Sequence, residues 1–508
     1  MVIIFGRIFT RFKIVVILIL LQMIVVWSLV GMLMTLYPRL RIVGTTISVL
    51  VFLALVESNK PSSYKLSWVI FVLTFLPVGG LLYLIFGNRR PTKRIAAYVG
   101  EHKLIAKHLD RKKIPDEMAA KFGRMASLFR YIRRASAYHP YQETKAVYYD
   151  FGEKMFDDIL EELKKAQRFI FLEYFIIYKS TMWDQILEIL LEKIQEGVDV
   201  RIIIDDFGSM KLFTNRYIRK LRSQGLKIVR FNPMRPFLLM FMNNRDHRKI
   251  IVVDGHTAFN GGMNISDEYI NRKSRFGVWK DTGVCLKGEG AWSFTLMFIE
   301  MWDTFCRKHE RINDYELYKC QQEVEASKDL LVLPYGDSPL DEEQVGEDVY
   351  IDLLNQARHY VYIFTPYLII SERMGYALRM AAKRGVDIRL VTPGIPDKKI
   401  IYRLTRSYYR FLLPDGVRIY EYTPGFMHAK SFVSDDQVAV VGTINLDYRS
   451  LYLHFECATL FYGGEIIQQI KQDTLETIWI SQEITSLSRK SLLGSLTDSL
   501  LHLLAPLL

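Results

Sequence analysis

Two short segments of the chain carry the same pattern of chemically reactive side chains. Each reads H-x-K-x4-D, and each has an asparagine 17 residues after its histidine. The first copy contains His247, Lys249, Asp254 and Asn264, and the second contains His428, Lys430, Asp435 and Asn445. One copy alone is a weak signal, because three fixed positions arise by chance in a chain of 508 residues. Two copies with the same downstream asparagine indicate a duplicated catalytic half-site.

The residue types suit chemistry on a tetrahedral phosphate diester. Lysine and asparagine side chains can stabilise the charge on the equatorial oxygens, while one imidazole attacks phosphorus and the other protonates the leaving oxygen. Because two lysines supply positive charge and the sequence has no clustered carboxylate motif, we expect neither a metal nor another cofactor.

Each histidine also needs a carboxylate to orient its second ring nitrogen. Asp281 and Glu456 follow the two motifs by 34 and 28 residues and lie in apolar segments, where an unpaired carboxylate would be costly. We therefore predict that these two acids orient the histidines. His454 stays open because it neighbours Glu456.

The segments around the motifs predict strands. Residues i and i+2 of a strand point to the same face, so His247 and Lys249 should project together, as should the corresponding pair in the second copy. Asp254 and Asp435 fall where each strand should end. Both belong to the catalytic motif, but their spacing favours orientation of neighbouring groups over contact with a substrate.

The motifs lie within a longer repeat of alternating strands and helices. The segments EGVDVRIII at 196–204 and RGVDIRLVT at 384–392 match almost residue for residue. This periodicity predicts an α/β fold made of two homologous units, residues 140–325 and residues 326–485.

Three apolar runs precede this repeat, at residues 14–36, 42–56 and 66–86. The first is long enough to cross a hydrocarbon core of about 30 Å. It is too long for the apolar part of a signal peptide, and no cleavage site follows it. We predict a transmembrane anchor over residues 1–88 with two or three spans.

The formal charge of +12 is concentrated near this anchor. Residues 1–88 carry a net +6, residues 89–134 carry +10, and residues 135–508 carry −4. The basic cluster after the third run predicts a juxtamembrane linker over residues 89–139 and a cytoplasmic catalytic part. Arg7, Arg11 and Lys13 favour a cytoplasmic N-terminus as well, so the number of spans stays open.

The same distribution bears on the function class. A nuclease would need a basic face on its catalytic units, which are slightly acidic here, so we expect no nucleic-acid partner. The four cysteines form no CxxC pair, which excludes a disulfide scaffold or a cysteine-rich zinc module. Residues 486–508 predict an amphipathic tail that either leans on the membrane or covers the sheets.

The paired motifs are similar to the HKD motifs that define the phospholipase D superfamily, and the chain resembles the bacterial cardiolipin synthases within it. The resemblance rests on the two motifs with their flanks, 244–249, 262–269 and 445–450, and extends to 77–87 and 504–508. It therefore covers nearly the whole chain.

This resemblance implies two phospholipase D-like units in one bilobal catalytic domain, preceded by transmembrane helices. It implies a multi-pass enzyme of the bacterial plasma (inner) membrane that acts on phosphatidylglycerol and sits among anionic lipids. The implied reaction joins two phosphatidylglycerols into cardiolipin and releases glycerol through a phosphatidyl-histidine, without metal or nucleotide.

The resemblance also assigns roles. His247 is taken as the nucleophile and His428 as the general acid and then base, with Lys249, Lys430, Asn264 and Asn445 holding the phosphate. The main alternative is a membrane-bound phospholipase D that hydrolyses phospholipid to phosphatidic acid. An inactive membrane scaffold is disfavoured because both motifs are complete.

Overall fold

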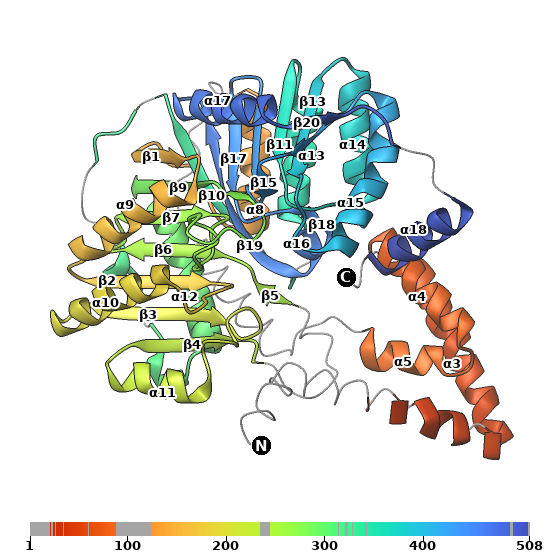
Figure 1. The fold of residues 1–508 in the computed structure, drawn as a ribbon. Coiled ribbons are helices and arrows are strands. Elements are labelled where there is room, and N and C mark those ends of the chain that lie inside the picture. Colours follow the sequence, from red (N-terminus) through yellow and green to blue (C-terminus); the bar gives the residue numbers. More distant parts are fainter. Residues whose placement is uncertain are drawn as a thin grey trace. The chain divides into compact units, whose positions relative to one another are not determined.

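In the computed structural model the chain forms two compact units (Figure 1). The smaller comprises Met1–Lys93, Asn232–Asn244 and Leu492–Leu508, and the larger comprises Arg94–Phe231 and Arg245–Ser491. The structure describes residues 21, 24, 25, 27–33, 35–58, 60–87, 123–233, 244–312, 314–320, 324–327, 329–340, 343–487 and 491–505.

The described part of the smaller unit is helical. Its helices are α3 (Pro38–Glu57), α4 (Ser62–Thr74), α5 (Gly79–Phe86) and α18 (Leu492–Leu504). Among the described residues, α3 is the one helix that is long and apolar enough to cross a membrane. At about 1.5 Å per residue its 20 residues span about 30 Å. Residues 14–20, 22, 23, 26 and 34 of the first apolar run lie outside the described residues.

The third apolar run, residues 66–86, is divided between two short helices and does not form one long helix. Helix α4 ends at Thr74, and α5 begins at Gly79. Pro77 stands between them and has no backbone N–H to continue a helix. Both short helices contact α3, where the Gly80 N–H donates to Ser48 Oγ at 3.0 Å. A Cβ on Gly80 would lie 2.5 Å from the Ser48 Cα, so this close approach requires glycine.

The C-terminal tail packs in the same unit. Ser67 of α4 donates a hydrogen bond to the Leu503 carbonyl of α18 at 2.6 Å. Three leucines of α18 stay exposed: Leu492, Leu496 and Leu500. The tail thus contacts α4, while the side chains of these three leucines are exposed.

The larger unit contains two sheets with the same strand order, which confirms the predicted duplication (Figure 1). The first has seven strands in the order β1-β9-β7-β6-β2-β3-β4. Their bounds are β1 (Thr144–Tyr149), β2 (Phe169–Tyr174), β3 (Asp199–Asp205), β4 (Lys227–Phe231), β6 (Lys249–Val253), β7 (Thr257–Gly261) and β9 (Gly283–Gly288).

The second sheet repeats this order as β10-β19-β17-β16-β11-β13-β14 and adds β20 at its end. Its strands are β10 (Leu331–Asp337), β11 (Tyr360–Phe364), β13 (Asp387–Pro393), β14 (Arg418–Tyr422), β16 (Ser431–Ser434), β17 (Val438–Gly442), β19 (His454–Tyr462) and β20 (Gln482–Ile484). In each sheet the strand that follows the H-x-K motif, β6 or β16, lies next to a central parallel strand, β2 or β11.

Helices cover both sheets because the strands bury side chains on both faces. In β2, Phe169 and Phe171 belong to one core and Ile170, Leu172 and Tyr174 to the other, as alternation requires. The helices of the first sheet are α9 (Gly152–Lys165), α10 (Thr181–Gln195), α11 (Asn215–Ser223) and α12 (Ala291–Phe305). Those of the second are α13 (Val345–Gln356), α14 (Glu372–Lys383), α15 (Lys399–Leu412), α16 (Tyr448–Tyr452) and α17 (Ile466–Trp479).

One hydrophobic core joins the two halves. It contains α12 and residues of both sheets, among them Phe171, Trp302, Val332 and Phe432. Helix α8 (Met125–Ser136) also packs into this core through Phe129 and Ile132. The end of the predicted basic linker is therefore part of the catalytic unit, and the two sheets share a single folded body.

Two short pairings cross from one half to the other. Strand β5 (Arg245–Asp246) pairs with the start of β19, and β15 (Gly425–Met427) pairs with β8 (Val278–Lys280). A third short pair, β12 (Leu368–Ile369) with β18 (Leu446–Asp447), lies within the second half. The two crossing pairs immediately precede the two motif histidines.

Candidate active site

Each motif histidine is held by backbone from the opposite half. After β5, the His247 N–H donates to the Phe455 carbonyl of β19 at 2.9 Å. After β15, the His428 N–H donates to the Lys280 carbonyl at the end of β8 at 2.7 Å. The two histidines thus occupy corresponding places at the junction between the halves.

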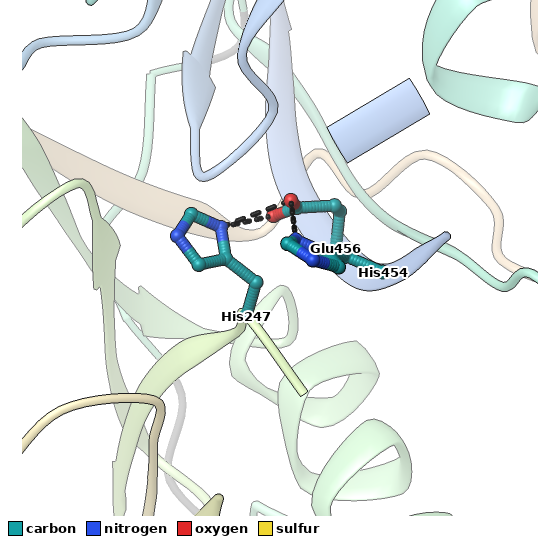
Figure 2. A group of neighbouring side chains, drawn as sticks. All are labelled: His247, His454 and Glu456. Atoms are coloured by element: carbon teal, nitrogen blue, oxygen red, sulfur yellow. Dashed lines mark hydrogen bonds and ion pairs between the residues drawn. The ribbon is translucent and has the colours of Figure 1, made fainter. Parts of the chain in front are cut away.

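The orienting carboxylates are crossed in the same way. His247 Nδ1 lies 2.9 Å from Glu456 Oε1 and 3.0 Å from Oε2 (Figure 2). His428 Nδ1 lies 2.6 Å from Asp281 Oδ2. The sequence singled out both acids, but its spacing associated each with the motif before it, whereas the structure pairs each with the other motif. The reason is that β19 and β8 deliver their acids across the junction.

Different neighbouring residues surround the two acids. Ser450 Oγ donates to Glu456 Oε1 at 2.6 Å, and Thr443 Oγ1 donates to Oε2. Gly262 stands at the position that corresponds to Thr443, and a Cβ there would lie 2.0 Å from Asp281 Oδ1. Glycine at 262 leaves room for Asp281, whereas threonine at 443 donates a hydrogen bond to Glu456. The residue at this position therefore matches the acid beside it.

The two motif lysines are buried beside the histidines. Lys249 and Lys430 each donate a hydrogen bond from Nζ to the carbonyl of the histidine two residues earlier. Lys430 Nζ also lies 2.9 Å from His428 Nδ1. Burial lowers the pKa of Lys249 to about 8 and that of Lys430 to about 7. An anionic ligand would therefore stabilise the charged form of both lysines.

The same environment keeps both imidazoles neutral. Burial, followed by the charge of Lys430, lowers the pKa of His428 to about 4. Burial and the charge of Lys249 lower the pKa of His247 well below its usual value. A neutral imidazole that donates from Nδ1 to a carboxylate carries a lone pair on Nε2. The arrangement therefore offers two nucleophilic nitrogens beside two cations.

Comparison with known proteins identifies the family of this site. A family profile described as "Cardiolipin synthase, PLD-like domain" matches residues 159–280 and 350–479, one segment in each half. A profile described as "Phospholipase_D-nuclease N-terminal" matches residues 45–88. A cardiolipin synthase of Geobacillus kaustophilus is 33% identical over 467 residues, which cover 90% of this chain and 92% of the relative. The chain belongs to the cardiolipin synthase family of the phospholipase D superfamily.

Other similar proteins agree with this membership. Cardiolipin synthase 2 of Bacillus anthracis is 34% identical over 457 residues, 89% of this chain and 88% of the relative. An uncharacterized protein of Streptococcus mutans is 45% identical over 90% of this chain and 99% of its own length. A phosphatidylserine synthase of Haemophilus influenzae shares the fold, with a TM-score of 0.56, 16% identity and coverage of 76% and 98% of the two chains.

The motif aspartates of this family member lie away from the histidines. Asp254 accepts hydrogen bonds from the backbone N–H groups of Gln167, Arg168 and Phe169, each at 2.8 Å. Asp435 accepts from Arg358, His359 and Tyr360 at 2.7 to 2.9 Å. Seven residues of extended chain separate each aspartate from its histidine, about 20 Å at about 3.3 Å per residue. These contacts place the aspartates at the start of β2 and β11 and not at the reacting atoms.

The two motif asparagines are buried near the histidines, in unequal surroundings. Asn264 accepts from the Ile176 N–H at 3.1 Å and donates to the Tyr269 hydroxyl at 2.7 Å. Asn445 has an Oδ1 without a hydrogen-bond partner among the described residues. Their contact with a phosphate remains a prediction.

Some residues at the site were not predicted as site residues. His454 lies against His247, with ring centroids 5.4 Å apart, and its Nδ1 is 3.7 Å from Glu456 Oε1 (Figure 2). Its position two residues before Glu456 on the same strand was the available signal. Ser450 and Thr443 carried no signal of their own, because their hydroxyls act only through the folded position of Glu456.

His247, His454 and Glu456 are also the group within the described ranges that could hold a metal ion. One ligand atom from each lies within 4.8 Å of the others. However, Lys249 and Lys430 place two positive charges beside this group, and both lower the pKa of His247. These two charges repel a cation, so the surroundings of this group favour an anion.

Matched substitutions of two aspartates separate their roles. Asp254→Asn removes the charge that accepts three backbone N–H groups, so the free energy of unfolding should fall by about 1–3 kcal/mol. Activity per folded molecule should stay within about twofold of the wild type. Asp281→Asn should instead lower kcat by about a thousandfold or more, because His428 loses the carboxylate that selects its tautomer. Chemical unfolding and steady-state rates on the same preparations measure both effects. Equal loss of kcat in the two variants would contradict this division.

Anion binding should weaken as the pH rises through about 7. The pKa of Lys430 is lowered to about 7 in the folded protein, so this ammonium is charged below that pH and neutral above it. Sulfate keeps its charge over the range, and its inhibition constant measured between pH 6 and 9 should therefore increase. In Lys430→Arg the guanidinium stays protonated, and the rise should be lost or move to higher pH. A sulfate constant in the wild type that does not change over this range would refute the assignment.

Proposed function

We propose that the chain is a membrane-bound cardiolipin synthase, which transfers a phosphatidyl group from one phosphatidylglycerol to a second and releases glycerol. The observation that carries the proposal is the crossed arrangement of two neutral histidines, each with its own carboxylate, beside two buried lysines. Family membership supplies the lipid class. The proposed location is the bacterial plasma membrane. The proposed partners are phosphatidylglycerol and other anionic lipids.

In the first step the Nε2 lone pair of His247 attacks the phosphorus of the donor lipid. His428, neutral in the free site, gains a proton when the anionic donor binds. The bond between phosphorus and the headgroup glycerol oxygen breaks, and the His428 imidazolium protonates that oxygen. The product is a phosphatidyl-histidine and free glycerol. Lys249 and Lys430 stabilise the equatorial oxygens of the transition state, and Asn264 and Asn445 are proposed to share this role.

In the second step a headgroup hydroxyl of the acceptor phosphatidylglycerol attacks the same phosphorus. His428, now neutral, takes the hydroxyl proton, and the bond to His247 breaks. Cardiolipin forms and both histidines return to their starting state. The whole reaction exchanges one phosphodiester bond for another and consumes no proton, electron or water. It is therefore reversible.

The unequal surroundings of the histidines favour this order of roles. Asp281 raises the pKa of His428 against the effect of burial, and an anionic donor would offset the nearby lysine charges and raise it further. The pKa of His247 is held well below its usual value by burial and both lysines. His428 is thus the easier of the two to protonate, and His247 is the one whose lone pair stays unprotonated.

The smaller unit supports the membrane part of the proposal. Helix α3 is long enough to span, and the outward side chains of α3 and α4 are apolar, with Leu50, Leu53 and Leu73 exposed to 60%, 55% and 48%. Such a surface is unfavourable in water and suits lipid. Together with the basic residues at 89–134, it supports a membrane anchor with the catalytic unit on the cytoplasmic side, and we propose that the anchor is multi-pass.

Vesicles of phosphatidylglycerol alone test the reaction. The purified full chain should form cardiolipin and glycerol in equal amounts, with mass spectrometry detecting the four-chain lipid and an enzymatic assay detecting glycerol. His247→Ala should abolish both products while leaving the unfolding temperature close to that of the wild type. Phosphatidic acid as the only lipid product would favour the hydrolase instead.

A change of leaving group tests which histidine is the nucleophile. A phosphatidyl ester of p-nitrophenol releases an anion that needs no protonation, so its first step does not require a general acid. His428→Ala should release about one equivalent of p-nitrophenolate per site in a burst, whereas His247→Ala should release none. The reverse result would exchange the two roles. Loss of the burst in both variants would contradict a covalent step without acid catalysis.

A further inference from the structure

The two halves repeat their backbone but not the side chains around their histidines. Aligning His247 with His428 places Arg245 opposite Phe426, and aligning the acids Glu456 and Asp281 places His454 opposite Trp279. The strand pairs agree, because Arg245 pairs with His454 and Phe426 pairs with Trp279. Four residues after the asparagines, Arg449 in the second half corresponds to Glu268 in the first.

The surroundings of His428 are aromatic. The ring centroids of Trp279 and Tyr269 each lie 5.3 Å from that of His428, and the Phe426 centroid lies 5.8 Å away. Glu268, at the position that corresponds to Arg449, accepts from Ser266 and pairs with Lys273 at 3.4 Å. This side of the site presents apolar rings and a carboxylate that already has partners.

The surroundings of His247 are cationic and polar. Arg245 is buried, lies 3.6 Å from Asp205, and stacks over the Phe207 ring at 5.4 Å. His454 is in register with Arg245, and neither of its ring nitrogens has a hydrogen-bond partner within the part of the chain that the structure describes. Its Nδ1 lies within ion-pair distance of Glu456 Oε1, at 3.7 Å, so Nε2 is the ring nitrogen that lacks a polar partner among the described residues.

Arg449 completes this side. It lies in α16, immediately after the motif asparagine segment, and its Nε is buried without a hydrogen-bond partner in the described ranges. Asp447 and Asp205 are close enough to raise its pKa, but burial and the charge of Arg245 outweigh them and lower it. The Arg449 carbonyl accepts the N–H of Leu453, the residue before His454, at 2.9 Å, and the charge of Arg449 lowers the pKa of His454. A partly buried guanidinium in this state is stabilised by an anionic ligand.

We propose that Arg449, Arg245 and His454 form a second anion-binding subsite beside His247, and that it binds the phosphodiester of the acceptor lipid. The proposal rests on the proposed function and specifies where its second substrate lies. In an acceptor phosphatidylglycerol a three-carbon bridge joins the attacking hydroxyl to a phosphate of its own. The acceptor phosphate must therefore lie next to the reacting phosphate, where Lys249 and Lys430 are already committed.

The groups around the two histidines differ in charge, and this difference bears on where the acceptor phosphate binds. Two phosphates in adjoining positions repel each other, and the cations near His247 offset that repulsion during the second step. The rings of Trp279, Phe426 and Tyr269 that surround His428 carry no charge with which to bind a second phosphate. Selection of an anionic acceptor over a neutral alcohol therefore depends on Arg449.

A competition between two acceptors in one vesicle tests the subsite. Vesicles contain phosphatidylglycerol, which is donor and anionic acceptor, and monoacylglycerol, a neutral acceptor that has the same glycerol hydroxyls but no phosphate. Attack by monoacylglycerol on the phosphatidyl-histidine gives an acyl-phosphatidylglycerol, with the hydroxyl proton passing to His428 and His247 released. Both products arise from one intermediate, so the ratio of cardiolipin to acyl-phosphatidylglycerol reports the acceptor step alone.

Arg449→Met should lower this product ratio by about tenfold or more, because a charge-assisted contact to the acceptor is lost. Arg449→Lys should keep an intermediate ratio, and Arg449→Glu, which introduces the residue found at the corresponding position 268, should give the lowest. His454→Asn should also lower the ratio. Arg219→Met, which changes an exposed arginine of α11, is the matched control and should leave the ratio unchanged.

A partly unfolded preparation would lower both products together and would not mimic the predicted shift in ratio. An unchanged ratio in Arg449→Met, with normal cardiolipin formation by the wild type, would overturn the subsite and leave the proposed function standing. Absence of cardiolipin with the wild-type chain would overturn both.

Discussion

The candidate active site depends on one constraint, which is that each motif histidine finds its carboxylate in the other half of the larger unit. His247 bonds to Glu456 and His428 to Asp281, and the short pairs β5–β19 and β15–β8 bring the partners together. Neither half can therefore assemble a complete histidine–carboxylate pair alone. The shared core around α12 has a functional consequence, since it holds the two sheets in the register that these contacts require.

A second consequence is electrostatic. The junction buries two lysines and two histidines, and burial disfavours the charged form of all four. The carboxylates of Glu456 and Asp281 partly offset this cost, but the site remains short of negative charge. A phosphodiester supplies that charge, so the same feature that destabilises the free site favours substrate and, more strongly, the transition state.

Duplication explains the shared framework, and divergence of a few side chains explains how the halves differ in role. Asp254 and Asp435 carry out the same structural task in both halves, each at a positive φ of 54° and each accepting three backbone N–H groups. By contrast, Gly262 and Thr443 accommodate acids of different length, and the residues beside the two histidines differ in charge. A reaction that treats two lipids unequally is compatible with such an arrangement, whereas two identical half-sites would not distinguish donor from acceptor.

The amino-acid sequence by itself determined the duplicated α/β fold, the two H-x-K motifs and the identity of the orienting acids. These follow from local patterns: strand alternation, fixed spacing and carboxylates in apolar segments. It did not determine which acid serves which histidine, because the two pairs join residues that are 209 and 147 positions apart in the chain. Nor could residue spacing reveal that residues 66–86 divide into α4 and α5, that α8 joins the core of the larger unit, or that His454 lies against His247. Those features arise from packing between distant segments, which only the tertiary structure decides.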